Sequence, residues 1–320
     1  MSALLETKRL KKYFSTPRGM LHAVDDVDLS IERGATLGVV GESGCGKSTL
    51  GRTVIRLLDA TAGEVLFDGR DVMKMDKSEL RQFRNQAQII FQDPYASLNP
   101  RLTVSEIIAE PLIAGHVMRH PADIEKKVFK MMDTVGLAAR LVNTYPHELD
   151  GGRRQRIGIA RSLVLDPQFI VCDEPVSALD VSIQAQILNL LMDLQREKKL
   201  TYMFITHDLS VVKHISTEIA VMYLGKCVEH GPAKAIFANP LHPYTKALLS
   251  AIPIPDLSQR GKKRELLTGE VSSPINPKPG CRFASRCPYA SQACTQQDIQ
   301  LQDFGGGHYA ACCALNASDQ

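Results

Sequence analysis

Residues 41–48 read Gly-Glu-Ser-Gly-Cys-Gly-Lys-Ser, and they follow the apolar run Thr36–Val40, which has the length and composition of a buried strand. The residues from Ser48 to Ile55 are compatible with a helix. A strand, a glycine-rich turn and a helix in this order predict a phosphate-binding loop, because the glycines let backbone N–H groups point inward and the helix adds its positive end. We expect Lys47 to reach the β- and γ-phosphates of a nucleotide and the Ser48 hydroxyl to ligate Mg²⁺.

The composition is that of a soluble globular protein, with 44% hydrophobic and 23% charged residues in a chain of 320. No apolar run approaches the ~20 residues that span a bilayer, and Met1–Lys12 does not have the pattern of a signal peptide. These features predict a cytosolic protein. The formal net charge is only +3 and both signs are mixed along the chain, so the charge gives no case for nucleic acid as a partner.

Two further apolar runs end in polar residues suited to nucleotide chemistry. The run Phe169–Asp173 is followed by Glu174. Nucleotides bind at the carboxyl ends of parallel strands, so we expect Asp173 to hold Mg²⁺ through its water shell and Glu174 to polarise the attacking water as general base. The run Tyr202–Thr206 delivers His207 to the same edge, where we expect this histidine to contact the γ-phosphate.

The interval between Lys47 and Asp173 is longer than one strand–helix unit requires, which indicates an inserted segment. A short predicted strand leads into Gln92, and helical patterns cover residues 104–113 and 124–135. The insert closes with Asp150-Gly151-Gly152 at the start of an amphipathic helix. A Gly-Gly pair that opens a helix is a second anion-binding terminus, so one chain carries two phosphate-binding surfaces.

In this order the motifs resemble those of the ATP-binding subunits of ABC transporters, over about residues 5–250. The resemblance implies an α/β fold, a P-loop NTPase ABC cassette with a RecA-like α/β core, an antiparallel β subdomain and a helical signature subdomain at about residues 100–160. The cassette would occupy residues 1–250, and a C-terminal Cys-rich extension residues 251–320. The implied cofactors are ATP and Mg²⁺.

The resemblance also assigns the site residues. Nucleotide contacts come from an aromatic residue that stacks on adenine, from the phosphate loop and from the signature turn: Tyr13, Gly41, Glu42, Ser43, Gly44, Cys45, Gly46, Lys47, Ser48, Thr49, Asp150, Gly151 and Gly152. The implied Mg²⁺ ligands are Ser48, Gln92 and Asp173, and the implied catalytic residues are Glu174, His207 and Gln92.

Three segments narrow the resemblance to importers of oligopeptides, dipeptides or nickel, with the greatest likeness to the second ATPase of an oligopeptide permease: Gln92–Arg101, Asp173–Ser182 and His242–Thr245. The resemblance implies a peripheral subunit at the cytoplasmic face of the membrane. Its partners would be a non-identical ABC ATPase, two transmembrane permease subunits and, indirectly, an extracytoplasmic solute-binding protein.

The alternatives differ in substrate and in class. Peptide, nickel and oligosaccharide importers share this type of ATPase, so the substrate stays open. A soluble ABC ATPase that acts on nucleic acid would need tandem cassettes, a long coiled coil or a basic face, and the sequence shows none of these. A P-loop kinase would not explain Leu149–Arg153 or His207.

The signature departs from the family pattern. Where the family has Leu-Ser-Gly-Gly-Gln, this chain has Asp150 in place of the serine and Arg153 in place of the glutamine. A carboxylate about 4 Å from a phosphate would be repelled by on the order of 4 kcal/mol at an effective dielectric constant near 20. Either Asp150 weakens the site shared with the partner, or it turns away and pairs with Arg153 or Arg154.

Four cysteines follow a proline-rich stretch near the end of the chain: Cys281, Cys287, Cys294 and Cys312. Their spacing fits neither a zinc ribbon nor the common ferredoxin runs, yet four thiolates can hold a [4Fe–4S] cluster or Zn²⁺, and a tail without metal is the third alternative. The resemblance implies an iron–sulfur cluster in this tail, with Cys313 as the spare thiol. We expect the metal to act as the core of the tail, and its loss to leave nucleotide binding intact.

Overall fold

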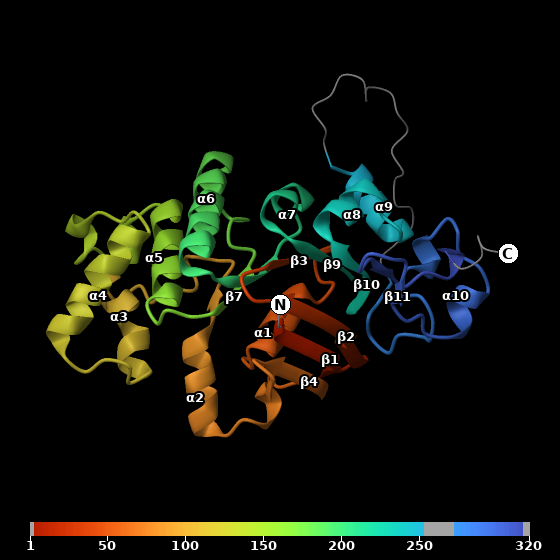
Figure 1. The fold of residues 1–320 in the computed structure, drawn as a ribbon, viewed down its shortest axis with the longest axis horizontal. Coiled ribbons are helices and arrows are strands. Elements are labelled where there is room, and N and C mark those ends of the chain that lie inside the picture. The colour runs from red at the N-terminus through yellow and green to blue at the C-terminus, as the bar shows by residue number, and fades with distance from the viewer. Residues whose placement is uncertain (1–2, 253–271, 316–320) are drawn as a thin grey trace, which may run out of the picture. The chain divides into compact units, whose positions relative to one another are not determined.

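The computed structural model describes residues 3–252 and 272–315, which form two compact units (Figure 1). The first unit holds the residues up to 4, residues 32–35 and residues 74–204, and the second holds residues 5–31, 36–73 and those from 205 on. Part of the predicted C-terminal extension, residues 253–271 and 316–320, lies outside the described residues. Within residues 3–252 and 272–315, no helix is both long enough and apolar enough to cross a membrane.

The first unit is built on three neighbouring strands in the order β8-β7-β6. Their bounds are Ala87–Ile90 for β6, Phe169–Asp173 for β7 and Thr201–Ile205 for β8. All residues of β7 and β8 are buried, as continuous apolar strands in a covered sheet should be. Strands β6 and β7 are parallel, with Ala87 opposite Phe169 and Ile90 opposite Cys172, so both deliver the chain to the same edge.

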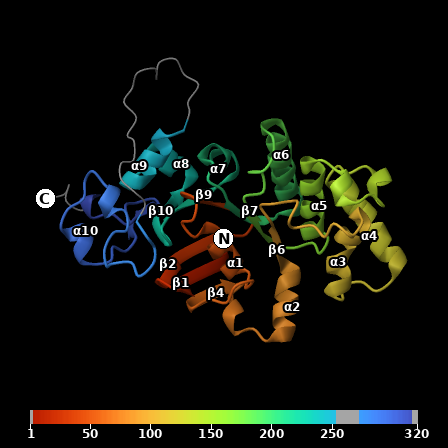
Figure 2. The same ribbon diagram turned by 180° about the vertical axis from the view of Figure 1, so that it is seen from behind.

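The helices of the first unit are α2 (Lys77–Gln86), α3 (Val104–Ala114), α4 (Pro121–Thr134), α5 (Gly151–Leu163) and α6 (Val181–Lys198), with 3-10 turns η2 (Ala139–Leu141) and η3 (Pro146–Glu148). Helices α3, α4 and α5 pack together, as both views show (Figures 1 and 2). Local capping sets where two of these helices begin. The side chains of Asp76 and Thr103 each accept an N–H bond in a capping box, which fixes the start of α2 and of α3.

The second unit contains an antiparallel sheet in the order β2-β1-β4-β5 and a row of strands in the order β11-β12-β10-β9-β3. The first sheet consists of β1 (Ala3–Thr16), β2 (Gly19–Glu32), β4 (Ala62–Phe67) and β5 (Arg70–Asp71). The row consists of β3 (Thr36–Val40), β9 (Glu218–Tyr223), β10 (Lys226–Pro232), β11 (Gln302–Asp303) and β12 (Tyr309–Ala310). The helical segments are α1 (Lys47–Val54), η1 (Val72–Lys74), α7 (Leu209–Ile215), α8 (Ala233–Ala238), α9 (Pro243–Ser250), η5 (Ala284–Arg286) and α10 (Ala293–Gln296).

The described tail, residues 272–315, packs directly on the strands of the second unit. Strand β12 pairs antiparallel with β10, and Ile275 forms an antiparallel bridge with Leu21 of β2. Phe283 is 1% exposed and belongs to a core cluster that includes Tyr223 and Tyr244. The tail therefore shares a hydrophobic core with the strands, which differs from the expectation that a metal alone would supply its core.

Candidate functional site

The phosphate loop lies between β3 and α1, and its glycines are required by close backbone contacts. Gly41 and Gly46 have φ values of 150° and 106°. A Cβ at Gly41 would collide with the carbonyl oxygen of Met222, and a Cβ at Gly46 with that of Ala23. Glycine is thus the only residue that fits these positions without moving the neighbouring backbone.

Lys47 lies against the start of this loop. Its side chain is buried, and Nζ donates to the carbonyl oxygens of Gly41 at 2.8 Å and Glu42 at 2.9 Å. The ammonium group is therefore fixed within the loop by main-chain oxygens. A buried cation at the N-terminus of a helix, beside a turn of glycines, suits a polyphosphate.

Tyr13 lies on β1, next to strand β2 of the antiparallel sheet. Its ring stacks on that of His22, with centroids 3.8 Å apart and an interplanar angle of 19°. The Tyr13 phenol donates to the Asp25 carboxylate, and burial together with this bond raises the pKa of Tyr13. The phenol is thus a fixed donor at neutral pH. The neighbouring Ala23 contacts Gly46, so Tyr13 lies close to the phosphate loop, while its contact with adenine stays a prediction.

His207 follows β8 at the end of β3 that carries the phosphate loop. The Thr206 N–H donates to the Val39 carbonyl oxygen at 3.2 Å, and Asp208 caps α7 by accepting the Ser210 N–H at 2.8 Å. His207 is exposed between these two anchored residues. Its position suits a contact with a terminal phosphate, a role that stays a prediction.

In the first unit, Gln92 and Glu174 follow neighbouring parallel strands and meet at their shared edge. Gln92 Nε2 donates to Glu174 Oε2 at 2.8 Å. Glu174 has a φ of 48°, a left-handed conformation that costs a non-glycine residue on the order of 1 kcal/mol. Asp173, the last residue of β7, is completely buried. The strained turn sets the direction of the Glu174 side chain, and the amide of Gln92 holds its carboxylate.

The side chain of Asp150 in the signature turn pairs with Arg153. Asp150 is the N-cap of α5, where Oδ1 accepts the Arg153 N–H at 2.8 Å and Oδ2 lies 3.4 Å from Arg153 Nε. This geometry favours the interpretation in which Asp150 pairs with Arg153. Gly152 needs to be glycine, because a Cβ there would lie 2.9 Å from Ile183 Cγ2 on α6.

The sequence did not predict the role of Arg154. Its guanidinium lies over the Tyr95 ring, 3.9 Å from the centroid, and donates to the carbonyl oxygens of Pro146 at 2.6 Å and His147 at 3.2 Å. Arg154 thereby stabilises the segment that leads into the signature turn. It is not the partner of Asp150. Its only sequence signal was its place one turn after Asp150.

The tail cysteines lie near one another but do not form a recognisable metal site. Cys281 N–H donates to the Cys294 carbonyl oxygen at 2.7 Å, and burial raises the pKa of the Cys281 thiol to about 11. In the described part of the chain, no three Cys, His, Asp or Glu side chains are grouped so that they could hold a metal ion. The predicted centre at Cys281, Cys287, Cys294 and Cys312 is therefore not confirmed.

Comparisons with known proteins show the family of the chain. A family model described as ABC transporter matches residues 24–177, and one described as Oligopeptide/dipeptide transporter, C-terminal region matches residues 228–294. The oligopeptide transport ATP-binding protein OppF of Salmonella typhimurium (strain LT2) is 54% identical over 309 residues, which cover 96% of this chain and 92% of that protein. The dipeptide transport ATP-binding protein DppF of Escherichia coli (strain K12) is 49% identical and covers 99% of this chain and 96% of its own length.

Solved structures share the fold at lower identity. The post-hydrolysis dimer of the ATP-binding cassette MJ0796 bound to ADP and Pi superposes with a TM-score of 0.66 at 29% identity, covering 72% of this chain and 98% of that one. CbiO1 of Clostridium perfringens, part of an ABC transporter complex, gives a TM-score of 0.65 at 28% identity, covering 75% and 92%. The fold and the phosphate loop thus define an ABC ATPase cassette. Within this class, the chain belongs to the oligopeptide/dipeptide transporter ATPases, which couple ATP hydrolysis to peptide transport.

Proposed function

We propose that this chain binds and hydrolyses Mg·ATP as one ATPase subunit of an importer that takes up oligopeptides or dipeptides across the cytoplasmic membrane. The observation that carries the proposal is the presence of two anion-binding turns on one chain. One is the glycine loop with buried Lys47, and the other is the Gly151-Gly152 turn that opens α5. A chain of this kind can bind one nucleotide and cover a second one held by another subunit.

The loop residues fit a nucleotide polyphosphate. Gly41 and Gly46 leave no room for side chains, and the Lys47 ammonium provides the positive charge. We assign Ser48, Asp173 and Gln92 as the Mg²⁺ ligands, since hydroxyl, carboxylate and amide oxygens are what this ion prefers. When bound, the ion neutralises charge that develops on the transferred phosphoryl group.

Glu174 is assigned as the general base. Its carboxylate would accept a proton from the water that attacks the γ-phosphate, and the Gln92 amide keeps that carboxylate oriented. His207 would donate to a γ-phosphate oxygen and stabilise the charge there. Tyr13 would stack on adenine with the ring face that His22 does not cover.

The signature turn would act on the nucleotide of a partner. The N-terminus of α5 offers the N–H groups of Gly151 and Gly152 to a γ-phosphate, and Arg153 compensates the charge of Asp150. We propose that the partner is a non-identical ABC ATPase, and that each active site forms when the two subunits close on each other.

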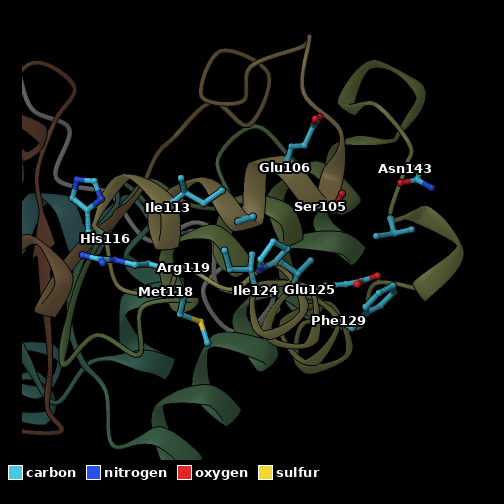
Figure 3. Close-up of a pocket in the computed structure, with 14 residues that line it drawn as sticks. Ser105, Glu106, Ile113, His116, Met118, Arg119, Ile124, Glu125, Phe129 and Asn143 are labelled. Atoms are coloured by element: carbon cyan, nitrogen blue, oxygen red, sulfur yellow. The ribbon is translucent and has the colours of Figure 1, made fainter.

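A pocket in the helical part of the first unit is proposed as the permease docking site. It has a volume of about 660 Å³ and lies between α3 and α4, where Ile113, Ile124 and Phe129 line it (Figure 3). Ile113 is 56% exposed and Phe129 36%, so two large apolar side chains are accessible at the same pocket. An apolar helix on the cytoplasmic side of a permease fits such a groove.

Docking on two permease subunits would place the chain at the cytoplasmic face of the membrane, where ATP is available. A solute-binding protein outside the membrane would deliver the substrate. Peptide is the proposed substrate because the relatives described above carry that function in their names, and nickel or an oligosaccharide is the alternative.

We further propose that Cys281, Cys287, Cys294 and Cys312 bind one metal centre, a [4Fe–4S] cluster with Zn²⁺ as the alternative. The support is the ligand set itself, because four soft thiolates in one short segment suit both an iron–sulfur cluster and Zn²⁺. Anaerobic purification followed by iron, sulfide and zinc analysis tests this. One zinc per chain would replace the cluster, and a metal-free tail that resists proteases would refute the proposal.

The experiment that tests the transport function is solute uptake by the complete importer in sealed vesicles. We expect labelled peptide to accumulate with ATP, and expect no accumulation when Lys47→Ala is introduced. Uptake of nickel or an oligosaccharide instead would change the substrate, and binding of this chain to no permease would contradict the function.

A further inference from the structure

The tail segment Cys281–Cys287 contacts the phosphate loop through a fork-like ion pair. Arg286 Nη1 donates to Glu42 Oε2 at 2.9 Å and to Oε1 at 3.1 Å, and Nη2 donates to Oε1 at 3.1 Å. The two side chains are only 7% and 28% exposed, so water screens the pair poorly. Glu42 is the second residue of the loop, and its carbonyl oxygen accepts the bond from Lys47 Nζ. The tail therefore holds the residue whose backbone fixes the phosphate-binding lysine.

A second arginine of the same segment, Arg282, contacts the residues around Tyr13, the predicted adenine-stacking residue. Arg282 pairs with the Asp25 carboxylate through Nη2 and donates to the Leu224 carbonyl oxygen through Nη1. The side chains of Arg282 and Asp25 are 6% and 10% exposed. Asp25 is also the acceptor of the Tyr13 phenol. Arg282 thus holds the predicted adenine-stacking ring through one shared carboxylate.

Phe283, which lies between the two arginines in sequence, is connected to the phosphate loop through Tyr244. The Glu42 N–H donates to Tyr244 Oη at 2.8 Å, and the Tyr244 ring packs on Phe283 with centroids 5.4 Å apart. Cys281 and Cys287 pack against this same cluster. These contacts connect the tail to the phosphate loop, while the effect of metal loss on nucleotide binding stays a prediction.

We infer that the segment Cys281–Cys287 is a positioning element of the nucleotide site, in which Arg286 fixes the phosphate loop through Glu42 and Arg282 fixes Tyr13 through Asp25. The inference rests on the proposed nucleotide site. Because one arginine acts at the phosphate end and the other at the base end, their loss affects different parts of the ligand.

The test is calorimetric binding of ATP and of inorganic tripolyphosphate to the full-length chain. Arg286→Gln should weaken both ligands by similar factors, at least about fivefold. Arg282→Gln should weaken ATP to a similar extent and leave tripolyphosphate unchanged. Arg286→Lys should restore part of the affinity. In a Glu42→Gln background, Arg286→Gln should add little further loss, because its partner is already neutral.

His308→Ala is the matched control. His308 lies 2.7 Å from Glu229 and ties the tail to β10, without contact to Glu42 or Asp25. It should lower the melting temperature without changing either affinity. Unchanged ATP binding in both arginine variants, or equal losses in the control, would overturn the inference. Absence of ATP binding in the unmodified chain, or a Lys47→Ala chain that binds normally, would instead refute the nucleotide site itself.

Discussion

At the scale of single residues, the proposed function makes hydrolysis depend on the carboxylate of Glu174. This side chain leaves the end of β7 in a left-handed conformation and is held by Gln92. Glu174→Gln keeps the shape and loses the base, so we expect normal ATP binding and a turnover reduced by a factor of about 10² to 10⁴. ATPase assays on the assembled complex, with the partner's own site inactivated, measure this. Near-normal turnover would remove Glu174 from the catalytic role.

Asp150 offers a second residue-scale prediction. Serine and aspartate are equally good N-caps, so Asp150→Ser should leave both the stability and the complex ATPase rate unchanged. Asp150→Ala removes the cap of α5 and should cost about 1 kcal/mol of stability. Thermal unfolding and ATPase assays of both variants provide the comparison. A higher ATPase rate in the serine variant would show that the carboxylate opposes the phosphate after all.

The local sequence predicted the elements that carry the candidate site, because strand, glycine turn and helix occur together at Thr36–Val54 and Glu174 directly follows the strand that ends at Asp173. The partner of the Asp150 side chain could not be predicted from the sequence. Arg153 and Arg154 both compete for it, and the outcome depends on the cap geometry and on the Tyr95 ring, which binds Arg154 from a distant part of the chain.

At the scale of elements, helix α9 carries a pH-sensitive cap. His242 Nδ1 accepts the Tyr244 N–H at 3.1 Å, and burial lowers the pKa of His242 to about 4. An unfolded histidine titrates near ~6.5, so below that pH only the unfolded chain takes up the proton. The stabilising contribution is therefore complete above about pH 6.5 and is lost as the pH falls toward 4.

His242→Asn tests this contribution, because asparagine can cap α9 but does not titrate. Between pH 7 and pH 5 we expect the unmodified chain to lose about 2 kcal/mol more unfolding free energy than the variant. Denaturant unfolding at the two pH values gives the difference. Parallel losses in both proteins would show that His242 is not the group that titrates.

Elements with a local signal were predicted nearly to the residue. The expected strand Thr36–Val40 is β3, and the expected helix over residues 104–113 is α3, which ends one residue later. Strand pairing by the tail was not predicted. Ile275 lies in a proline-rich stretch without periodicity, and its bridge to Leu21 depends on a strand at the other end of the chain.

At the scale of the whole molecule, the two phosphate-binding turns imply an active site that one chain cannot complete. The phosphate loop lies in one compact unit and the signature turn in the other, and under the proposed function each turn serves one nucleotide. Without a partner's signature turn, the γ-phosphate lacks donors on its second face. The isolated chain should therefore bind ATP and hydrolyse it slowly.

The pocket proposed as the permease docking site gives a separate prediction at this scale. Ile113→Asp places a charge on the apolar part of the pocket between α3 and α4, where the proposed permease helix would bury it. We expect loss of co-purification with the permease and unchanged ATP binding by the chain. Ser105→Ala, at the same pocket, is the mild control. A complex that still assembles with Ile113→Asp would move the docking site elsewhere.

The most direct test of the account is the rate of ATP hydrolysis per chain, measured for the isolated protein over a range of concentrations and for the assembled importer at the same ATP concentration. If two subunits share each active site, turnover by the isolated chain is slow and rises strongly upon assembly, and Glu174→Gln in this chain abolishes the increase at its own site. A monodisperse monomer with full activity that does not depend on concentration would contradict it.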